Sequence, residues 1–160
     1  MKKILFIGFI MLLILGCEEF ESYKVDYTNT AVYFPQEGQV QTRSFVVNED
    51  NTIKVGVVMG GRRENNNLET ADYIISDTLI TDPGLSMLPS DYYSLDNESR
   101  FIINPGSFQG MVEITIENEF YEDPAALDES YVLPFLLVST SLDSILEGRE
   151  ALMLKLRYEA

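Results

Sequence analysis

The stretch Met111-Val112-Glu113-Ile114-Thr115-Ile116-Glu117 decides the fold class of this 160-residue chain, because apolar and polar side chains alternate strictly from Val112 onward. Alternation with a period of two is typical of a β-strand that buries one face and exposes the other. We therefore expect Val112, Ile114 and Ile116 to point into a hydrophobic core.

Comparable runs lie on both sides of this strand. Alternation is also clear in residues 53–60 and 152–158, and residues 131–138 are almost entirely apolar. Shorter β-rich runs are residues 31–35, 43–47, 71–79 and 101–103. Turn-forming residues separate these runs, and no long helical period is present. The sequence predicts an all-β fold, an antiparallel two-sheet β-sandwich of about seven strands.

Pro134 conflicts with the otherwise apolar run of residues 131–138. Proline has no backbone N–H and cannot donate to a strand ladder. We expect this strand either to lie at a sheet edge or to bulge at Pro134.

The N-terminus has the organisation of an export signal. Lys2 and Lys3 precede an apolar run, residues 4–15, which is too short to cross a bilayer. The stretch ending in Gly16-Cys17 resembles the lipobox of bacterial lipoproteins, in which the cysteine is acylated. The expected organisation is a lipoprotein signal peptide at 1–16, a lipidated acidic tether at 17–30 and one β-sandwich domain at 31–160.

Lipidation of Cys17 would hold the protein on a membrane, because two or more acyl chains anchor stably. The acidic residues that follow, Glu18-Glu19-Phe20-Glu21, resemble the export tag of Bacteroidetes lipoproteins that reach the outer face of the outer membrane. We expect a lipid-anchored outer-membrane protein that faces the cell exterior, and the periplasmic face is the alternative.

Composition excludes several classes of function. The formal net charge of −15 repels nucleic acid, so no nucleic-acid partner is expected. The chain has no histidine, and Cys17 is its single cysteine. The usual general base, the usual zinc ligand and a thiol nucleophile within the folded domain are therefore missing. We expect no enzyme activity, no catalytic residues, no cofactor and no metal site.

The order of the predicted elements resembles the immunoglobulin-like N-terminal domain of a family of unknown function on Bacteroidetes surface lipoproteins. Such domains are often encoded in polysaccharide-utilisation loci. The matching pieces are Val32-Tyr33-Phe34-Pro35, residues 55–61, Leu88-Pro89 with Tyr92-Tyr93-Ser94-Leu95, residues 103–116, and Tyr131-Val132-Leu133-Pro134-Phe135 with Ser139 and Ser141. The resemblance implies an immunoglobulin-like sandwich and a surface module in glycan capture, usually followed by a second domain.

Three residue pairs are the candidate ligand-binding residues: Tyr92 and Tyr93, Phe120 and Tyr121, and Arg62 and Arg63. Aromatic faces can stack on sugar rings, but the same rings can instead close the open ends of a sandwich. Residues 88–95 are expected to form a loop whose tyrosines fold back on the sheets. The arginines, in a polar run expected to be an exposed loop, can pair with carboxylates of a partner or an acidic glycan, or simply keep the loop soluble.

Two functions remain open from the sequence. One is a non-catalytic cell-surface lipoprotein module associated with glycan capture, alone or within a glycan-utilisation complex. The other is a structural spacer or protein-interaction domain that presents a partner or a C-terminal domain and has no ligand of its own.

Overall fold

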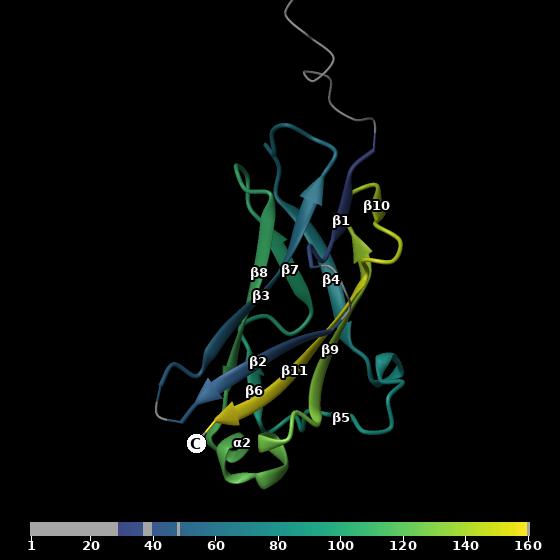
Figure 1. The fold of residues 1–160 in the computed structure, drawn as a ribbon. Coiled ribbons are helices and arrows are strands. Elements are labelled where there is room, and N and C mark those ends of the chain that lie inside the picture. Colours follow the sequence, from purple (N-terminus) through teal and green to yellow (C-terminus); the bar gives the residue numbers. More distant parts are fainter. Residues whose placement is uncertain (1–28, 37–39, 48, 160) are drawn as a thin grey trace, which may run out of the picture.

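The computed structural model describes residues 29–36, 40–47 and 49–159. In this part of the chain eleven strands form two sheets, accompanied by one short α-helix and two 3-10 turns (Figure 1). The predicted all-β two-sheet sandwich is confirmed.

The first sheet has five strands in the order β10, β1, β3, β8, β6. Their bounds are Ser144–Ile145 (β10), Ala31–Tyr33 (β1), Thr52–Gly60 (β3), Gln109–Ile116 (β8) and Tyr93–Leu95 (β6). The antiparallel pair β3 and β8 forms its centre, with Thr52 opposite Thr115 and Val58 opposite Gln109.

The second sheet has the order β2, β11, β9, β4, β7, and β5 pairs with the first residues of β9. The bounds are Val40–Val46 (β2), Ala151–Glu159 (β11), Tyr131–Thr140 (β9), Glu69–Ile75 (β4), Arg100–Ile103 (β7) and Ser86–Met87 (β5). β11 is antiparallel to β9 but parallel to β2. The strands beyond the about seven expected, β5, β6 and β10, have only two or three residues each.

The hydrophobic core lies between the two sheets. Val112, Ile114 and Ile116 of β8 have no exposed surface, as the alternation predicts. The second sheet supplies buried side chains from β9 and β11, namely Leu133, Phe135, Leu137, Leu152, Leu154 and Leu156. Complete burial of one such side chain contributes about 1.5–3 kcal/mol, so this contact between the sheets is the main source of stability.

The prediction for Pro134 is wrong, because β9 has β11 on one side and β4 on the other. The register shift of β9 against β4 lies at Asp72/Tyr73, away from Pro134. The backbone N–H of Leu137 points toward β11, because it donates to the carbonyl oxygen of Glu150 in the segment before that strand. Backbone groups alternate between the two sides of a strand, so the nitrogen of Pro134, three residues earlier, points toward the β4 side. On that side β4 ends at Ile75 and β5 ends at Met87, which leaves no ladder for Pro134 to interrupt.

The described chain enters and leaves the sandwich at opposite ends. β1 begins at the end drawn uppermost in Figure 1, whereas β11 ends at the lower end beside the helix α2 (Asn118–Glu122). At the upper end the backbone of Asn29 crosses Gly61, where a Cβ atom would lie 2.2 Å from the Asn29 carbonyl oxygen. Gly61 has φ +92°, so this crossing needs glycine for both space and backbone conformation.

We expect Ile114→Asp to destabilise the protein by more than about 4 kcal/mol, because it buries an unpaired carboxylate in the centre of the core. Thr115→Asp is the matched control, because Thr115 directly follows Ile114 but its half-buried side chain lies on the opposite face of β8. Thermal unfolding followed by circular dichroism measures both variants. Equal melting temperatures for the two would show that the faces of β8 are assigned wrongly.

Candidate functional site

An aromatic cluster closes the lower end of the sandwich. Phe120 of α2 is completely buried, and four rings surround it at centroid distances of 5.6–6.2 Å, mostly edge-on: Phe45, Tyr92, Tyr121 and Tyr158. Phe120 is therefore part of the core, and its ring is not accessible for stacking on a ligand. Tyr92 and Tyr121 are half-buried and expose only part of each side chain.

The side chain of Asp123 holds two tyrosines at this end of the sandwich by hydrogen bonds. Its Oδ2 atom accepts hydrogen bonds from the hydroxyl groups of Tyr131 at 2.5 Å and Tyr92 at 3.1 Å. Its Oδ1 atom accepts from the backbone N–H of Ala125 and so caps the 3-10 turn η3 (Pro124–Leu127). Both side-chain oxygens of Asp123 thus form hydrogen bonds that stabilise the fold.

These hydrogen bonds change the protonation behaviour of the three groups. The Tyr131 hydroxyl and the Ala125 N–H lower the pKa of Asp123 below its ordinary value. The same carboxylate raises the pKa of Tyr131 to about 12. The pKa of Tyr92 is raised mainly by burial and further by Asp123. A carboxyl group that works as a general acid needs the opposite shift.

Two open depressions flank α2. One, of about 560 Å³, is lined by Val47, Glu49, Asn51, Asn118, Tyr121 and Glu122. The other, of about 490 Å³, is lined by Asp91, Tyr92, Glu119, Glu122, Asp123 and Pro124. Carboxylates line both depressions and are the majority in the second, so this end disfavours anionic ligands.

Tyr93 points to a different part of the surface from Tyr92. Residues 93–95, expected to be loop, form the edge strand β6, with Tyr93 opposite Ile116 of β8. A third depression, of about 280 Å³, lies between β6 and the end of β4 and is lined by Ile75, Ser90, Tyr93, Ser94, Leu95 and Glu98. The structure therefore divides the predicted tyrosine pair between two sites.

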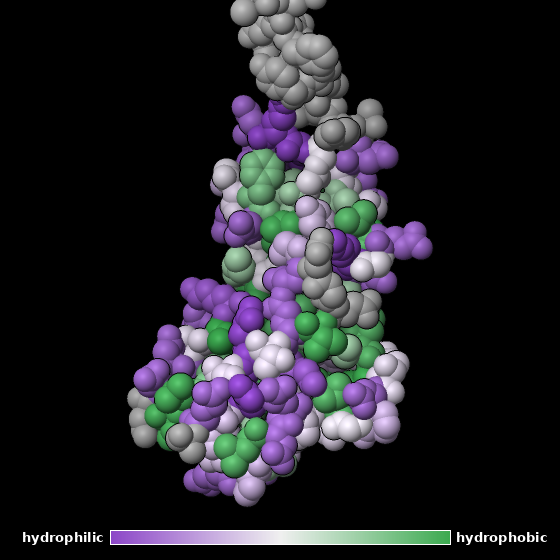
Figure 2. Space-filling model, viewed as in Figure 1, coloured by the Kyte–Doolittle hydropathy of each residue, from purple (hydrophilic) through white to green (hydrophobic). Residues whose placement is uncertain are grey.

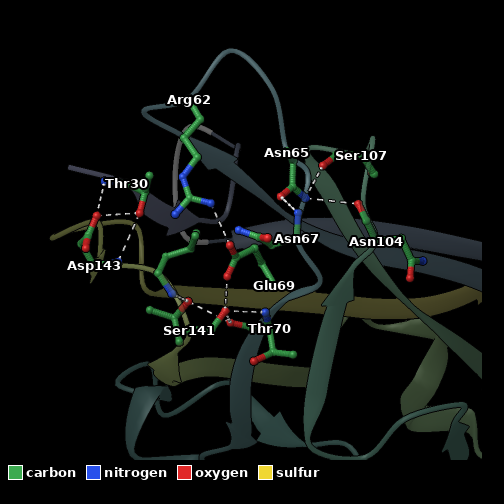
Figure 3. Close-up of polar contacts among 12 residues, drawn as sticks. Thr30, Arg62, Asn65, Asn67, Glu69, Thr70, Asn104, Ser107, Ser141 and Asp143 are labelled. Carbon is green, nitrogen blue, oxygen red and sulfur yellow. Dashed lines mark hydrogen bonds and ion pairs between the residues drawn. The ribbon is translucent and has the colours of Figure 1, made fainter. Parts of the chain in front are cut away.

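The arginine pair follows the end of β3 at the opposite, upper end of the sandwich (Figure 1), and Figure 3 shows the contacts of Arg62. Arg62 forms an ion pair of 2.8 Å with Glu69 of its own chain, and Ser141 donates to the other oxygen of Glu69 at 2.6 Å. Glu69 is 5% exposed, and the Ser141 hydroxyl is the main cause that lowers its pKa. The guanidinium group of Arg62 is thus paired with a carboxylate of its own chain instead of one from a partner. Arg63 is exposed on the same loop.

Further polar contacts stabilise this upper end, and the sequence analysis did not predict them. Asn65, expected in an exposed loop, is 2% exposed, and its side-chain amide donates to the carbonyl oxygens of Asn104 and Ser107 (Figure 3). Asp143 accepts from both the N–H and the hydroxyl of Thr30 at 2.8 and 2.7 Å. Thr30, assigned to the tether, is therefore already part of the sandwich. These contacts are long-range in sequence, so no local pattern marks them.

Among residues 29–36, 40–47 and 49–159, no group of three or more His, Cys, Asp or Glu side chains is placed to hold a metal ion. None of the helices in this described part is long and apolar enough to span a membrane. Cys17, the predicted lipidation site, lies outside the described residues.

A family model described as "-like, N-terminal domain" matches residues 27–144. The chain belongs to this N-terminal-domain family. Among solved structures, a Bacteroides ovatus protein of unknown function is 21% identical with a TM-score of 0.70, covering 84% of this chain and 53% of that one. A B. ovatus multidomain protein that includes DUF1735 is 15% identical with a TM-score of 0.58, covering 81% and 45%. The predicted resemblance to an N-terminal domain of a Bacteroidetes family of unknown function is confirmed.

The same sandwich recurs in EndoBT-3987 of Bacteroides thetaiotaomicron, solved with a Man5GlcNAc product. That match is 17% identical with a TM-score of 0.52 and covers 73% of this chain and 28% of EndoBT-3987. No curated protein matches the chain. The chain spans about half the length of the Bacteroides structures of unknown function that this N-terminal domain resembles.

We expect the melting temperature to change little between about pH 7 and pH 5 and to fall below about pH 4. Glu69, Asp72 and Asp123 have lowered pKa values in the folded state, so each contributes stability that is fully present above its unfolded pKa. That stability is lost as the pH falls through the folded pKa. Asp123→Asn should melt lower at pH 7 and show a shallower decline in acid. Calorimetry across this range checks it, and an unchanged decline would contradict the role given to Asp123.

Proposed function

We propose that the chain is a non-catalytic module of a cell-surface lipoprotein that takes part in glycan capture. The observation that carries the proposal is that its sandwich recurs as one part of longer Bacteroides proteins, one of which was solved with Man5GlcNAc. Its partners would be a glycan, or a glycan-utilisation complex, and the membrane to which the lipid attaches.

The carboxylates support a non-catalytic role. Glycoside hydrolysis needs two carboxyl groups at a fixed separation, one of them with a raised pKa. Asp91 with Asp96, and Glu122 with Asp123, are the pairs that sequence proximity suggests. Asp123 instead caps a turn and accepts two tyrosine hydroxyls, and Asp96 accepts the backbone N–H of Glu113. Each pair therefore has a member committed to holding the fold.

A spacer is the second candidate, and one observation favours it. The described chain enters at one end of the sandwich and leaves at the other, so the domain separates whatever precedes it from whatever follows it (Figure 1). At the entry, Thr30 is clamped by Asp143, and β1 pairs with both β3 and β10. A pull on the chain at this point is resisted by several hydrogen bonds at once.

A glycan array with the full chain separates the two candidates. A capture module should retain at least one family of neutral polysaccharides, whereas a spacer should retain none. Neutral glycans are expected because the domain is strongly acidic. An array without any binding, on protein shown to be folded, would refute the capture proposal and leave the spacer.

We expect Cys17→Ala to leave the domain folded and to release the protein from the membrane fraction, because the cysteine precedes every predicted strand and serves only the anchor. Fractionation of cells, with protease accessibility on the intact wild-type cells, measures both attachment and the face exposed. A Cys17→Ala protein that stays with washed membranes would refute lipid anchoring through this residue. Protection of the wild type from protease would favour the periplasmic face.

A further inference from the structure

The depression between β4 and β6 differs chemically from the acidic grooves beside α2. Its apolar lining residues are Ile75 and Leu95, which are half-buried and pack against the core. Its other lining residues, Tyr93, Ser90, Ser94 and Glu98, carry polar groups. We call this depression, with its six lining residues, the Tyr93 pocket.

Several polar groups of the Tyr93 pocket retain unused hydrogen-bonding capacity. In the described part of the chain, the hydroxyl groups of Tyr93 and Ser90 and the carboxylate of Glu98 have no hydrogen-bond partner. Ser94 donates its hydroxyl proton to Glu117 at 2.8 Å and keeps its lone pairs for an acceptor role. The pocket therefore offers both donors and acceptors to a ligand.

Tyr93 contrasts with the neighbouring tyrosines. The hydroxyl groups of Tyr73, Tyr92 and Tyr131 donate to Asn97, Asp123 and Asp123, respectively. Tyr93 is half-buried like Tyr92 and Tyr131, and burial is the main cause that raises its pKa. The Tyr93 hydroxyl has no protein partner in the described residues, so a ligand can form a hydrogen bond with it without breaking a contact of the fold.

Size and charge restrict the ligand. A volume of about 280 Å³ is at or below the lower limit of about 300 Å³ for sites that enclose drug-sized molecules, so the pocket suits one ring and not a whole oligosaccharide. Glu98 lines the pocket, and Asp96 lies close enough to affect the pKa of the adjacent Tyr73. The two negative charges disfavour uronic and sialic acids, and the Glu98 carboxylate can accept hydrogen bonds from neutral hydroxyl groups.

We propose that the Tyr93 pocket is a subsite for one neutral pyranose unit of a glycan chain. The apolar face of the sugar lies on Ile75 and Leu95, and its hydroxyl groups bond to Tyr93, Ser90 and Glu98. This inference rests on the capture function proposed above and gives it a place and a ligand class. Because the pocket accommodates only one ring, its affinity is weak, on the order of millimolar.

The test is an NMR titration of the full chain with mannotriose, maltotriose, cellotriose and trigalacturonic acid. At least one neutral trisaccharide should shift the amide signals of residues 90–98, and trigalacturonic acid should not. Tyr93→Phe removes only the hydroxyl and keeps the ring that packs on the core. This variant and Glu98→Gln should each weaken binding at least fivefold without lowering the melting temperature appreciably.

Tyr121→Phe is the matched control, because it removes the hydroxyl of a half-buried tyrosine in the groove beside α2. Its affinity should equal that of the wild type. Weaker binding by Tyr121→Phe with unchanged binding by Tyr93→Phe would move the site to α2 and overturn the proposal. No shift with any neutral trisaccharide would also overturn it. The capture function itself falls only if the glycan array is empty, so the two failures are distinguishable.

Discussion

The contact between β8 of the first sheet and the β9–β11 pair of the second is the interaction on which the rest of the structure depends. Val112, Ile114 and Ile116 meet a face built from Leu133, Phe135, Leu152, Leu154 and Leu156, and all of these side chains are almost completely buried. Each sheet has an apolar face that is unstable in water, so neither can persist without the other. Two-residue strands such as β5 and β10 exist only because this contact has already ordered their neighbours.

The two ends of the sandwich are closed by different chemistry. Aromatic rings around Phe120 seal the lower end, and Asp123 holds two of its tyrosines by their hydroxyl groups. An ion pair and a buried side-chain amide close the upper end, where Arg62 and Asn65 are bonded within the chain. Figure 2 shows hydrophilic and hydrophobic side chains interspersed over this face, with hydrophilic ones at the upper end. Groups committed to closure in this way are poorly available to ligands, which leaves the side of the sandwich as the better binding surface.

Membership of a family of N-terminal domains indicates the kind of protein in which this sandwich occurs. The Bacteroides structures with the same fold are about twice as long, so the sandwich occurs together with additional domains in those proteins. A weak sugar subsite on one module is useful in such an arrangement, because linked weak sites raise the overall affinity through effective concentration. Capture and spacing are then compatible roles for one rigid domain.

The sequence alone determined the fold class, the main strands and their inward faces, because period-two alternation is a local property of residues such as those of 112–116. The sequence also identified Tyr93 as a candidate ligand-binding residue, because its segment is aromatic. Only the tertiary structure decided that Tyr93 and Tyr92 face different sites, that Phe120 is core, and that Pro134 sits in a gap between β4 and β5. Likewise, β2 pairs in parallel with β11, more than a hundred residues later in the chain. Such pairings and the polar contacts of Glu69, Asn65 and Asp143 join distant segments, and no local pattern encodes which of them meet.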